Sequence, residues 1–119
     1  MANPFDKYLG KEDILNSQVC TYLKLQYPNL LWWHTPNESK KSKFEQYKAK
    51  KLGIKSGIPD IIIVGKSINI AIELKVYPNK LTTNQADVLD RLSNAGWITA
   101  VCYSLDEVIE VLKINITPC

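Results

Sequence analysis

Two acids and one lysine stand in the most apolar part of this chain. Asp60 lies at the mouth of the apolar run 57–64, and Glu73 and Lys75 lie inside the apolar run 68–76. A buried lone charge costs several kcal/mol of stability unless it is paired or binds a metal. Carboxylate oxygens are the ligands that Mg²⁺ and Mn²⁺ prefer. The three residues therefore predict a site in which Asp60 and Glu73 bind Mg²⁺ or Mn²⁺ beside the positive charge of Lys75.

The run 68–76 alternates between aliphatic and other side chains, as a strand with two different faces requires. Because successive side chains of a strand point to opposite faces, Glu73 and Lys75 share one face and the aliphatic residues share the other. Residues 65–67, Gly-Lys-Ser, separate this run from 57–64 and predict a hairpin. A Glu73–Lys75 pair on a solvated sheet face is the alternative to a metal site, and the pattern alone leaves both open.

Hydrophobic periodicity predicts the elements that must position these side chains. Helical spacing of apolar residues indicates helices at 11–26, at about 82–94 and after 104. Short apolar runs predict strands at 30–34, 57–64, 68–76 and 97–103. The segment 44–52 favours a short basic helix, and residues 1–10 favour an irregular start. A crossover through a helix implies that the last two strands are parallel. The sequence thus predicts one α/β domain over 1–119, with a mixed central sheet of about four strands in the order α-β-β-β-α-β-α.

Composition places the chain in an ordinary class. Its 119 residues are 45% hydrophobic and 23% charged, with a net charge of +3, which is typical of one soluble globular domain. No apolar run approaches a membrane span, and the first residues lack the pattern of a signal peptide. The three cysteines, at 20, 102 and 119, are odd in number and widely spaced, which argues against a disulfide framework. We therefore expect a cytoplasmic protein with no membrane partner.

The acids and the lysine also carry a family resemblance. Pro59-Asp60, followed after twelve residues by Glu73-Leu74-Lys75, resembles the P-D…(D/E)-x-K signature of the restriction-endonuclease-like nucleases. The chain resembles one branch of them, the virus-type replication-repair nuclease (VRR-NUC) domain. The matching pieces are Glu12, 34–38, 53–60, 72–75 and 81–85. The two-part signature is short, but the ordered set is more specific and covers nearly the whole chain.

The resemblance implies a restriction-endonuclease-like core and a metal-dependent nuclease. In such a site Asp60 and Glu73 hold the ion, and Glu12 lies beside it, directly or through water. Gln85 borders the same site. We expect the backbone carbonyl of Leu74 to be a further ligand for the Mg²⁺ or Mn²⁺ ion.

The flanking residues each have a simpler interpretation as well. Glu12 falls on the inward stripe of its predicted helix, yet acids also favour a first helical turn through the macrodipole. Gln85 stands three residues after Thr82, which is the spacing of a capping box. His34, the single histidine, suits a hydrogen-bonded strand end. The resemblance places a polar residue here at the border of the substrate groove, so His34 and Asn37 are candidates for phosphate contact.

Lysines gather in the long connection that leads to Asp60. Between positions 40 and 55 there is one acid, Glu45, against seven lysines: Lys40, Lys41, Lys43, Lys48, Lys50, Lys51 and Lys55. Such a local positive field suits the phosphates of a nucleic acid, and Lys80 is a further candidate contact. Phe44 and Tyr47 stand among these lysines and suit either base stacking or anchoring to the core. A solvated lysine-rich loop is the alternative.

These expectations converge on a Mg²⁺- or Mn²⁺-dependent endodeoxyribonuclease, a phosphodiester hydrolase. Lys75 would orient the attacking water or stabilise the oxyanion, and Gln85 would help to place that water. A chain this small has little surface for reading sequence, which favours branched DNA as substrate. The resemblance implies a phage-type or bacterial DNA-repair homodimer that resolves Holliday junctions. A non-catalytic DNA-binding module of the same fold is the alternative, and an interaction protein with a surface Glu–Lys pair is a third interpretation.

Overall fold

The computed structural model describes residues 3–36 and 42–116, and this part of the chain contains one four-stranded sheet. The strands lie in the order β1 (Leu31–His34), β2 (Ile61–Val64), β3 (Asn69–Leu74) and β4 (Ile98–Cys102). The pairs β1–β2 and β2–β3 are antiparallel, and β3–β4 is parallel. The predicted α/β fold with a mixed sheet, including the hairpin and the parallel crossover, is confirmed.

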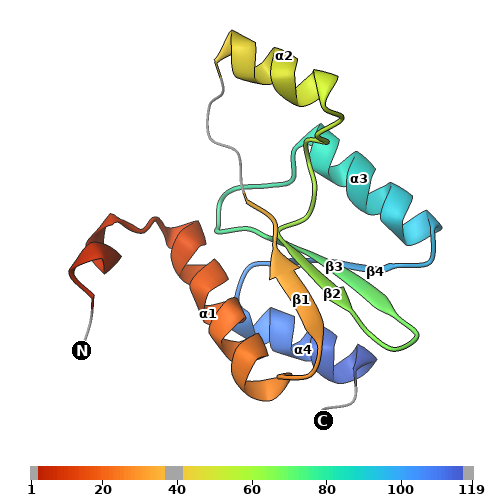
Figure 1. Ribbon diagram of the computed structural model, residues 1–119. Helices are drawn as coiled ribbons and strands as arrows, with labels where there is room; N and C mark the ends of the chain where they lie inside the picture. Colours follow the sequence, from red (N-terminus) through yellow and green to blue (C-terminus); the bar gives the residue numbers. More distant parts are fainter. Residues whose placement is uncertain (1–2, 37–41, 117–119) are drawn as a thin grey trace.

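Helices cover both faces of this sheet (Figure 1). The helices α1 (Lys11–Gln26) and α4 (Leu105–Asn115) pack together on one side, whereas α3 (Thr83–Asn94) lies on the other. Among the described residues, no helix is both long enough and apolar enough to cross a membrane.

The main core lies between β2, β3 and the α1–α4 pair. It contains Ile61 and Ile63 of β2, alternate residues of β3, and apolar residues of both helices, all buried. A fully buried aliphatic side chain contributes about 1.5–3 kcal/mol relative to an exposed one. The other face of β3 is also buried, but it carries Ala71 and Glu73. The alternation predicted for β3 is therefore present, and its polar face, with Glu73, lies on the side of the sheet that α3 covers.

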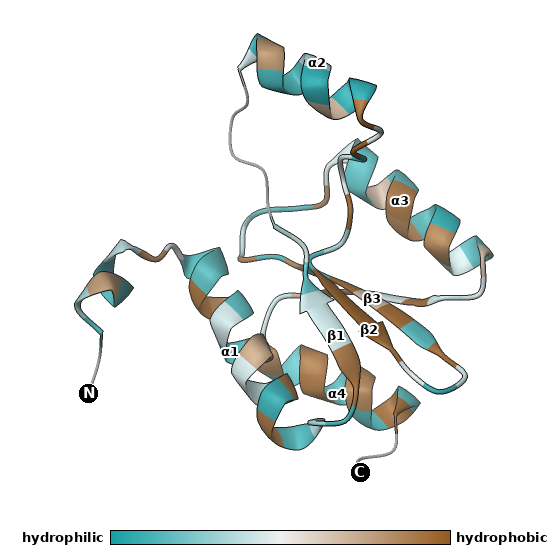
Figure 2. Ribbon diagram, in the orientation of Figure 1, coloured by the Kyte–Doolittle hydropathy of each residue, from teal (hydrophilic) through white to brown (hydrophobic). Residues whose placement is uncertain are grey.

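Two short elements stand outside this core. The helix α2 (Lys43–Lys51) buries none of its residues and projects away from the sheet, and most of it is hydrophilic in Figure 2. The Ser42 side chain accepts from the Glu45 N–H, and the Glu45 side chain accepts from the Ser42 N–H, so the helix begins with a capping box.

The N-terminal segment was predicted to be irregular, and this prediction is wrong for part of it. Residues Pro4–Tyr8 form a 3₁₀ helix (η1), because the Asn3 side chain accepts from the Phe5 N–H at 2.8 Å.

The strands of the central hairpin are shorter than the sequence runs that predicted them. Residues 57–60 lie before β2, and residues 75 and 76 lie after β3. Asp60 and Lys75 nevertheless continue the sheet locally. The Lys75 N–H donates to the Cys102 carbonyl at 3.0 Å, and the Asp60 carbonyl accepts from the Thr35 N–H at 2.7 Å. Both residues are thus fixed at one end of the sheet.

Gly57 is the point where the connection to β2 touches helix α3. Its φ is +78°, in the left-handed region that other residues rarely adopt. A Cβ at this position would lie 3.0 Å from the backbone of Asn84. The contact is with backbone, so it cannot be relieved by a rotamer change. Gly57 therefore allows the segment before Asp60 to pack against the first turn of α3.

We predict that Gly57→Ala lowers the free energy of unfolding more than Gly53→Ala does. Gly53 has a similar φ of +74°, but nothing lies within 4 Å of the Cβ it would gain. Gly53→Ala should cost about 1–2 kcal/mol of backbone strain, and Gly57→Ala should cost at least ~1 kcal/mol more because of the clash. Urea unfolding of both variants measures the difference. Equal losses would mean that the contact with α3 carries no strain.

Candidate metal centre

Three acids from distant parts of the chain meet at one end of the sheet. Glu12 of α1, Asp60 before β2 and Glu73 of β3 each offer a carboxylate oxygen, and these oxygens lie within 4.8 Å of one another. Ile61 pairs with Ile72, so Asp60 and Glu73 are the next cross-strand neighbours and their side chains share a face. The antiparallel register therefore brings the two acids together, and the first turn of α1 adds the third.

Asp60 has one satisfied and one unsatisfied carboxylate oxygen. Its side chain is 1% exposed, and Oδ2 accepts from the Leu74 N–H at 2.7 Å. Oδ1 is buried and has no hydrogen-bond partner among the described residues. An unsatisfied buried oxygen costs about 1–3 kcal/mol. A hard divalent cation would satisfy Oδ1 and would balance the three acids, so the residues present fit such an ion.

The pKa of Glu73 reflects the burial of these acids and their closeness to one another. Burial raises the pKa of the Glu73 carboxyl to about 8, and the charge of Asp60 adds to the rise. Lys75 opposes the rise, and Glu12 adds to it slightly. Without a cation, the cluster therefore retains a proton near neutral pH.

Lys75 lies on the same side as Glu73, but not in solvent. Its Nζ is 3.8 Å from Glu73 Oε2, and the two residues are only 7% and 2% exposed. The alternative of a solvated Glu–Lys pair on an open sheet face is therefore wrong. Ala71 and Glu73 are buried on that face of the sheet as well.

Gln85 has both of the roles that its position allowed. Its Oε1 accepts from the Thr82 N–H at 3.0 Å, and its own N–H donates to Thr82 Oγ1 at 3.1 Å. These bonds form the capping box of α3. With the amide oxygen held by the cap, Nε2 points to the acids and donates to Glu73 Oε2 at 3.3 Å. The cap thus orients the amide toward the site.

His34 supports the cluster from the end of β1. Its Nδ1–H donates to the Asp60 backbone carbonyl at 3.0 Å, which leaves Nε2 to accept from Asn16 Nδ2 at 3.2 Å. This geometry agrees with a hydrogen-bonded histidine at a strand end, and a phosphate contact by His34 stays a prediction. Asn16 was missed by the sequence reasoning. It stands one helical turn after Glu12, on the same side of α1, and that spacing was the available signal.

The remaining candidates lie around the acids rather than among them. Lys43, Lys48, Lys50 and Lys51 stand on the exposed helix α2, and Lys80 is exposed in the connection before α3. Asn37, Lys40 and Lys41 lie outside the described residues. The Leu74 N–H contacts Asp60, whereas a ligand role for the Leu74 carbonyl stays a prediction.

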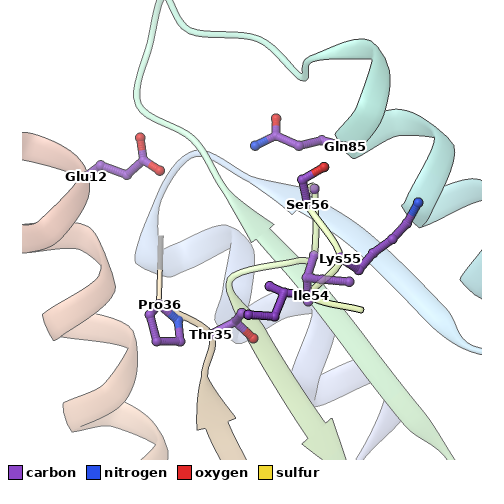
Figure 3. Close-up of a pocket in the computed structure, with 9 residues that line it drawn as sticks. Glu12, Thr35, Pro36, Ile54, Lys55, Ser56 and Gln85 are labelled. Carbon is purple, nitrogen blue, oxygen red and sulfur yellow. The ribbon is translucent and has the colours of Figure 1, made fainter. Parts of the chain in front are cut away.

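A cavity of about 470 Å³ opens beside the acids. Glu12 and Gln85 point toward each other across it from α1 and α3 (Figure 3). Lys55 also lines the cavity, but its side chain extends away from Glu12, along α3. Ser56 is fixed there by a hydrogen bond from Asn84 Nδ2. An anionic ligand could therefore lie between the acidic centre and a lysine at the far side.

Comparisons with known proteins agree with this arrangement. The family model of the VRR-NUC domain matches residues 10–106, which span every element from α1 to β4 and only the first two residues of α4. A solved structure described as a VRR_NUC domain protein superposes with a TM-score of 0.71 and 25% sequence identity, covering 91% of this chain and 89% of that one. No curated protein matches the chain.

We predict that binding of Mg²⁺ or Mn²⁺ to this centre strengthens as the pH rises toward 8. The Glu73 carboxyl must lose its proton to bind a cation, and its pKa is about 8. Affinity should rise roughly tenfold per pH unit below that value and level off above it. Calorimetry in two buffers of different ionisation enthalpy measures both affinity and proton release. Glu73→Gln should abolish the pH dependence, whereas Glu110→Gln should keep it, because Glu110 is an exposed residue of α4.

The raised pKa of Glu73 also determines how the stability of the metal-free protein depends on pH. The folded pKa is about 8 against an ordinary value of 4.5, so this group stabilises the fold fully below the lower value. That contribution is lost as the pH rises through about 8, and a bound cation should restore it. A metal-free protein whose stability did not fall over this range would contradict the assignment.

We predict that Asn16→Ala weakens divalent-cation binding roughly tenfold, because hydrogen bonds to the residues that hold a ligand keep that ligand in place. The substitution removes the donor to His34, which in turn positions the Asp60 backbone. Asn94→Ala, at the exposed end of α3, is the matched control. Manganese titration followed by electron paramagnetic resonance measures the affinity. Asn16→Asp, which offers no amide donor, should behave as Asn16→Ala; retained affinity in both would show that the bond is dispensable.

Proposed function

The chain belongs to the VRR-NUC domain family, and from that premise we propose that it hydrolyses phosphodiester bonds of DNA with the help of a divalent cation. Family membership implies nuclease-type chemistry. The observation that supports it here is the meeting of Glu12, Asp60 and Glu73 beside the buried ammonium of Lys75. This set matches what phosphoryl transfer needs, which is oxygen ligands for a cation and a fixed positive charge.

Each residue has a distinct part in this proposal. Asp60 and Glu73 hold the cation, Mg²⁺ or Mn²⁺, and Glu12 completes its ligands directly or through water. When bound, the cation polarises a phosphoryl oxygen and lowers the pKa of a bound water. Lys75 holds positive charge next to Glu73, where it stabilises the oxyanion that develops at phosphorus. Gln85, oriented by its cap, donates toward the same site and helps to place the water.

The surroundings favour a nucleic-acid substrate. Lysines of α2 stand on a fully exposed helix, and Lys55 lines the cavity next to the acids. We assign these lysines, with Lys80, to the phosphates of the strand. Phe44 and Tyr47 of α2 are 70% and 62% exposed, so they do not anchor α2 to the core. Exposed rings between lysines suit the stacking of unpaired bases.

The substrate that fits best is branched DNA. A chain of 119 residues has little surface for reading sequence, and its sequence shows no groove-reading motif, so direct base readout has no evident basis. Structure-selective cutting by a homodimer follows from the resemblance, since two copies can cut two strands symmetrically. The second candidate function is DNA binding without cleavage. The presence of all three acids and Lys75 favours cleavage over that candidate.

We predict that the protein cuts four-way and splayed DNA faster than linear duplex in Mg²⁺ or Mn²⁺. Asp60→Asn, Glu73→Gln and Lys75→Met should each lower the rate by roughly a hundredfold or more, because each removes charge at the reacting phosphate. Asp90→Asn of α3 and Lys113→Met of α4 are the matched controls, because both side chains are exposed. Gel electrophoresis of end-labelled linear, flap, splayed and four-way DNAs measures rate and position.

The products also report on the homodimer. Paired cuts placed symmetrically in opposite strands of a four-way junction are expected of two copies acting together. Tight binding without cleavage in any divalent metal would replace the proposal with the non-catalytic alternative. Cutting by the acid variants at the rate of the unaltered protein would remove the assigned residues.

A further inference from the structure

A second cavity, of about 450 Å³, adjoins the acidic centre at Glu12. Its walls are the first residues of α1 and the segment 76–79 that follows β3. Glu12 lines both cavities, and no other residue does. A strand that places a phosphate over the acids therefore lies next to both cavities.

The second cavity differs from the first in charge. Its lining includes Lys11, but also Glu12 and Asp13, so it offers no excess of positive charge to a phosphate. The Asp13 carboxylate is already engaged, since it accepts from the Gly10 N–H at 3.1 Å. The opposite wall carries Val76, Tyr77 and Pro78, which present carbon surface. These walls suit a flat, uncharged group better than an anion.

Tyr77 is the residue that can hold such a group. It lines the second cavity and is 83% exposed, the highest value among the exposed large hydrophobic residues. An aromatic ring left this open contributes little to the fold, but it can stack on the face of a base. Tyr77 also stands two residues after Lys75 and four after Glu73, so it is close in the chain to the residues assigned to the reaction.

The backbone around Tyr77 is held in place by the rest of the fold. The Asn79 N–H donates to the Val76 carbonyl at 2.9 Å, which closes the turn. The Tyr103 hydroxyl, from the segment after β4, donates to the Asn79 carbonyl at 3.2 Å. Because Lys75 is bound to Cys102 as well, both sides of the turn are tied to β4. The backbone that carries Tyr77 is therefore held next to Lys75 and the end of β4.

We propose that the second cavity is a nucleoside subsite, in which Tyr77 stacks on an unpaired base next to the phosphate that is cut. This inference rests on the proposed function and specifies its substrate. A base inside a duplex has both faces covered by its neighbours, so only an unpaired or splayed nucleotide can expose a face to Tyr77. The subsite thus selects DNA that is single-stranded on this side of the cut, whereas the lysines near the first cavity bind the strand through its phosphates.

The test compares Tyr77→Ala and Tyr77→Phe in DNA binding without divalent metal, so that cleavage plays no part. The probe is a splayed DNA carrying 2-aminopurine at successive positions of the unpaired strand. We expect Tyr77→Ala to weaken binding roughly tenfold and to reduce the fluorescence change at one position, and Tyr77→Phe to retain both. Tyr8→Ala is the matched control, because Tyr8 is 73% exposed and lines neither cavity.

Two further arms separate stacking from charge. An abasic nucleotide at the responsive position should remove the difference between the unaltered protein and Tyr77→Ala. The slope of affinity against salt concentration should stay the same in Tyr77→Ala and should decrease in Lys55→Ala. Fully paired duplex should bind equally to all the Tyr77 variants.

The outcomes distinguish this inference from the proposed function. Unchanged binding of splayed DNA by Tyr77→Ala, in a protein that cuts DNA, would overturn the subsite and leave the nuclease. Stacking at Tyr77 in a protein that never cuts would support the subsite and overturn hydrolysis. A protein that does not bind splayed DNA at all would overturn both.

Discussion

The central constraint on this structure is that Asp60 and Glu73 lie side by side in a buried position, where two neighbouring negative charges cost free energy. Their juxtaposition follows directly from the antiparallel register of β2 and β3, in which Ile61 faces Ile72. The same strands supply the aliphatic core on their other face, so a slip of the register by one residue would turn the polar residues of the shifted strand into that core. The hydrophobic core thus enforces an electrostatic conflict at the end of the sheet. Lys75 offsets part of it, and a divalent cation would offset the rest.

The elements around this pair act mainly by orientation. The cap of α3 holds the oxygen of the Gln85 amide, and its nitrogen therefore faces Glu73. The ring of His34 joins β1, the Asp60 backbone and Asn16 of α1. Each of these side chains stabilises local structure and positions the centre at once. For Gln85 the sequence left open a capping role and a position beside the acids. The two are compatible, because the amide oxygen serves the cap and the amide nitrogen contacts Glu73.

Much of this could be predicted from the sequence because the patterns were strong. The alternation in 68–76 and the helical spacing in 11–26 gave the faces of β3 and α1, and the P-D…E-x-K spacing indicated which acids would meet. The burial of Lys75 could not be predicted, because it depends on the tertiary packing around that end of the sheet. The contact between Asn16 and His34 joins positions far apart in the chain and has no signature in either segment. The 3₁₀ turn at 4–8 depends on a single side-chain cap.

The wide separation of the three acids along the chain has a consequence for folding. Glu12, Asp60 and Glu73 belong to a helix, a loop end and a strand that become neighbours only when α1 docks on the completed sheet. An unfolded chain has no such cluster, so a cation that binds here binds the native state alone and draws the equilibrium toward it. A bound ion would then link segments that are far apart in the sequence, and its release would remove the link. Only a completely folded copy of the protein would be able to hydrolyse DNA.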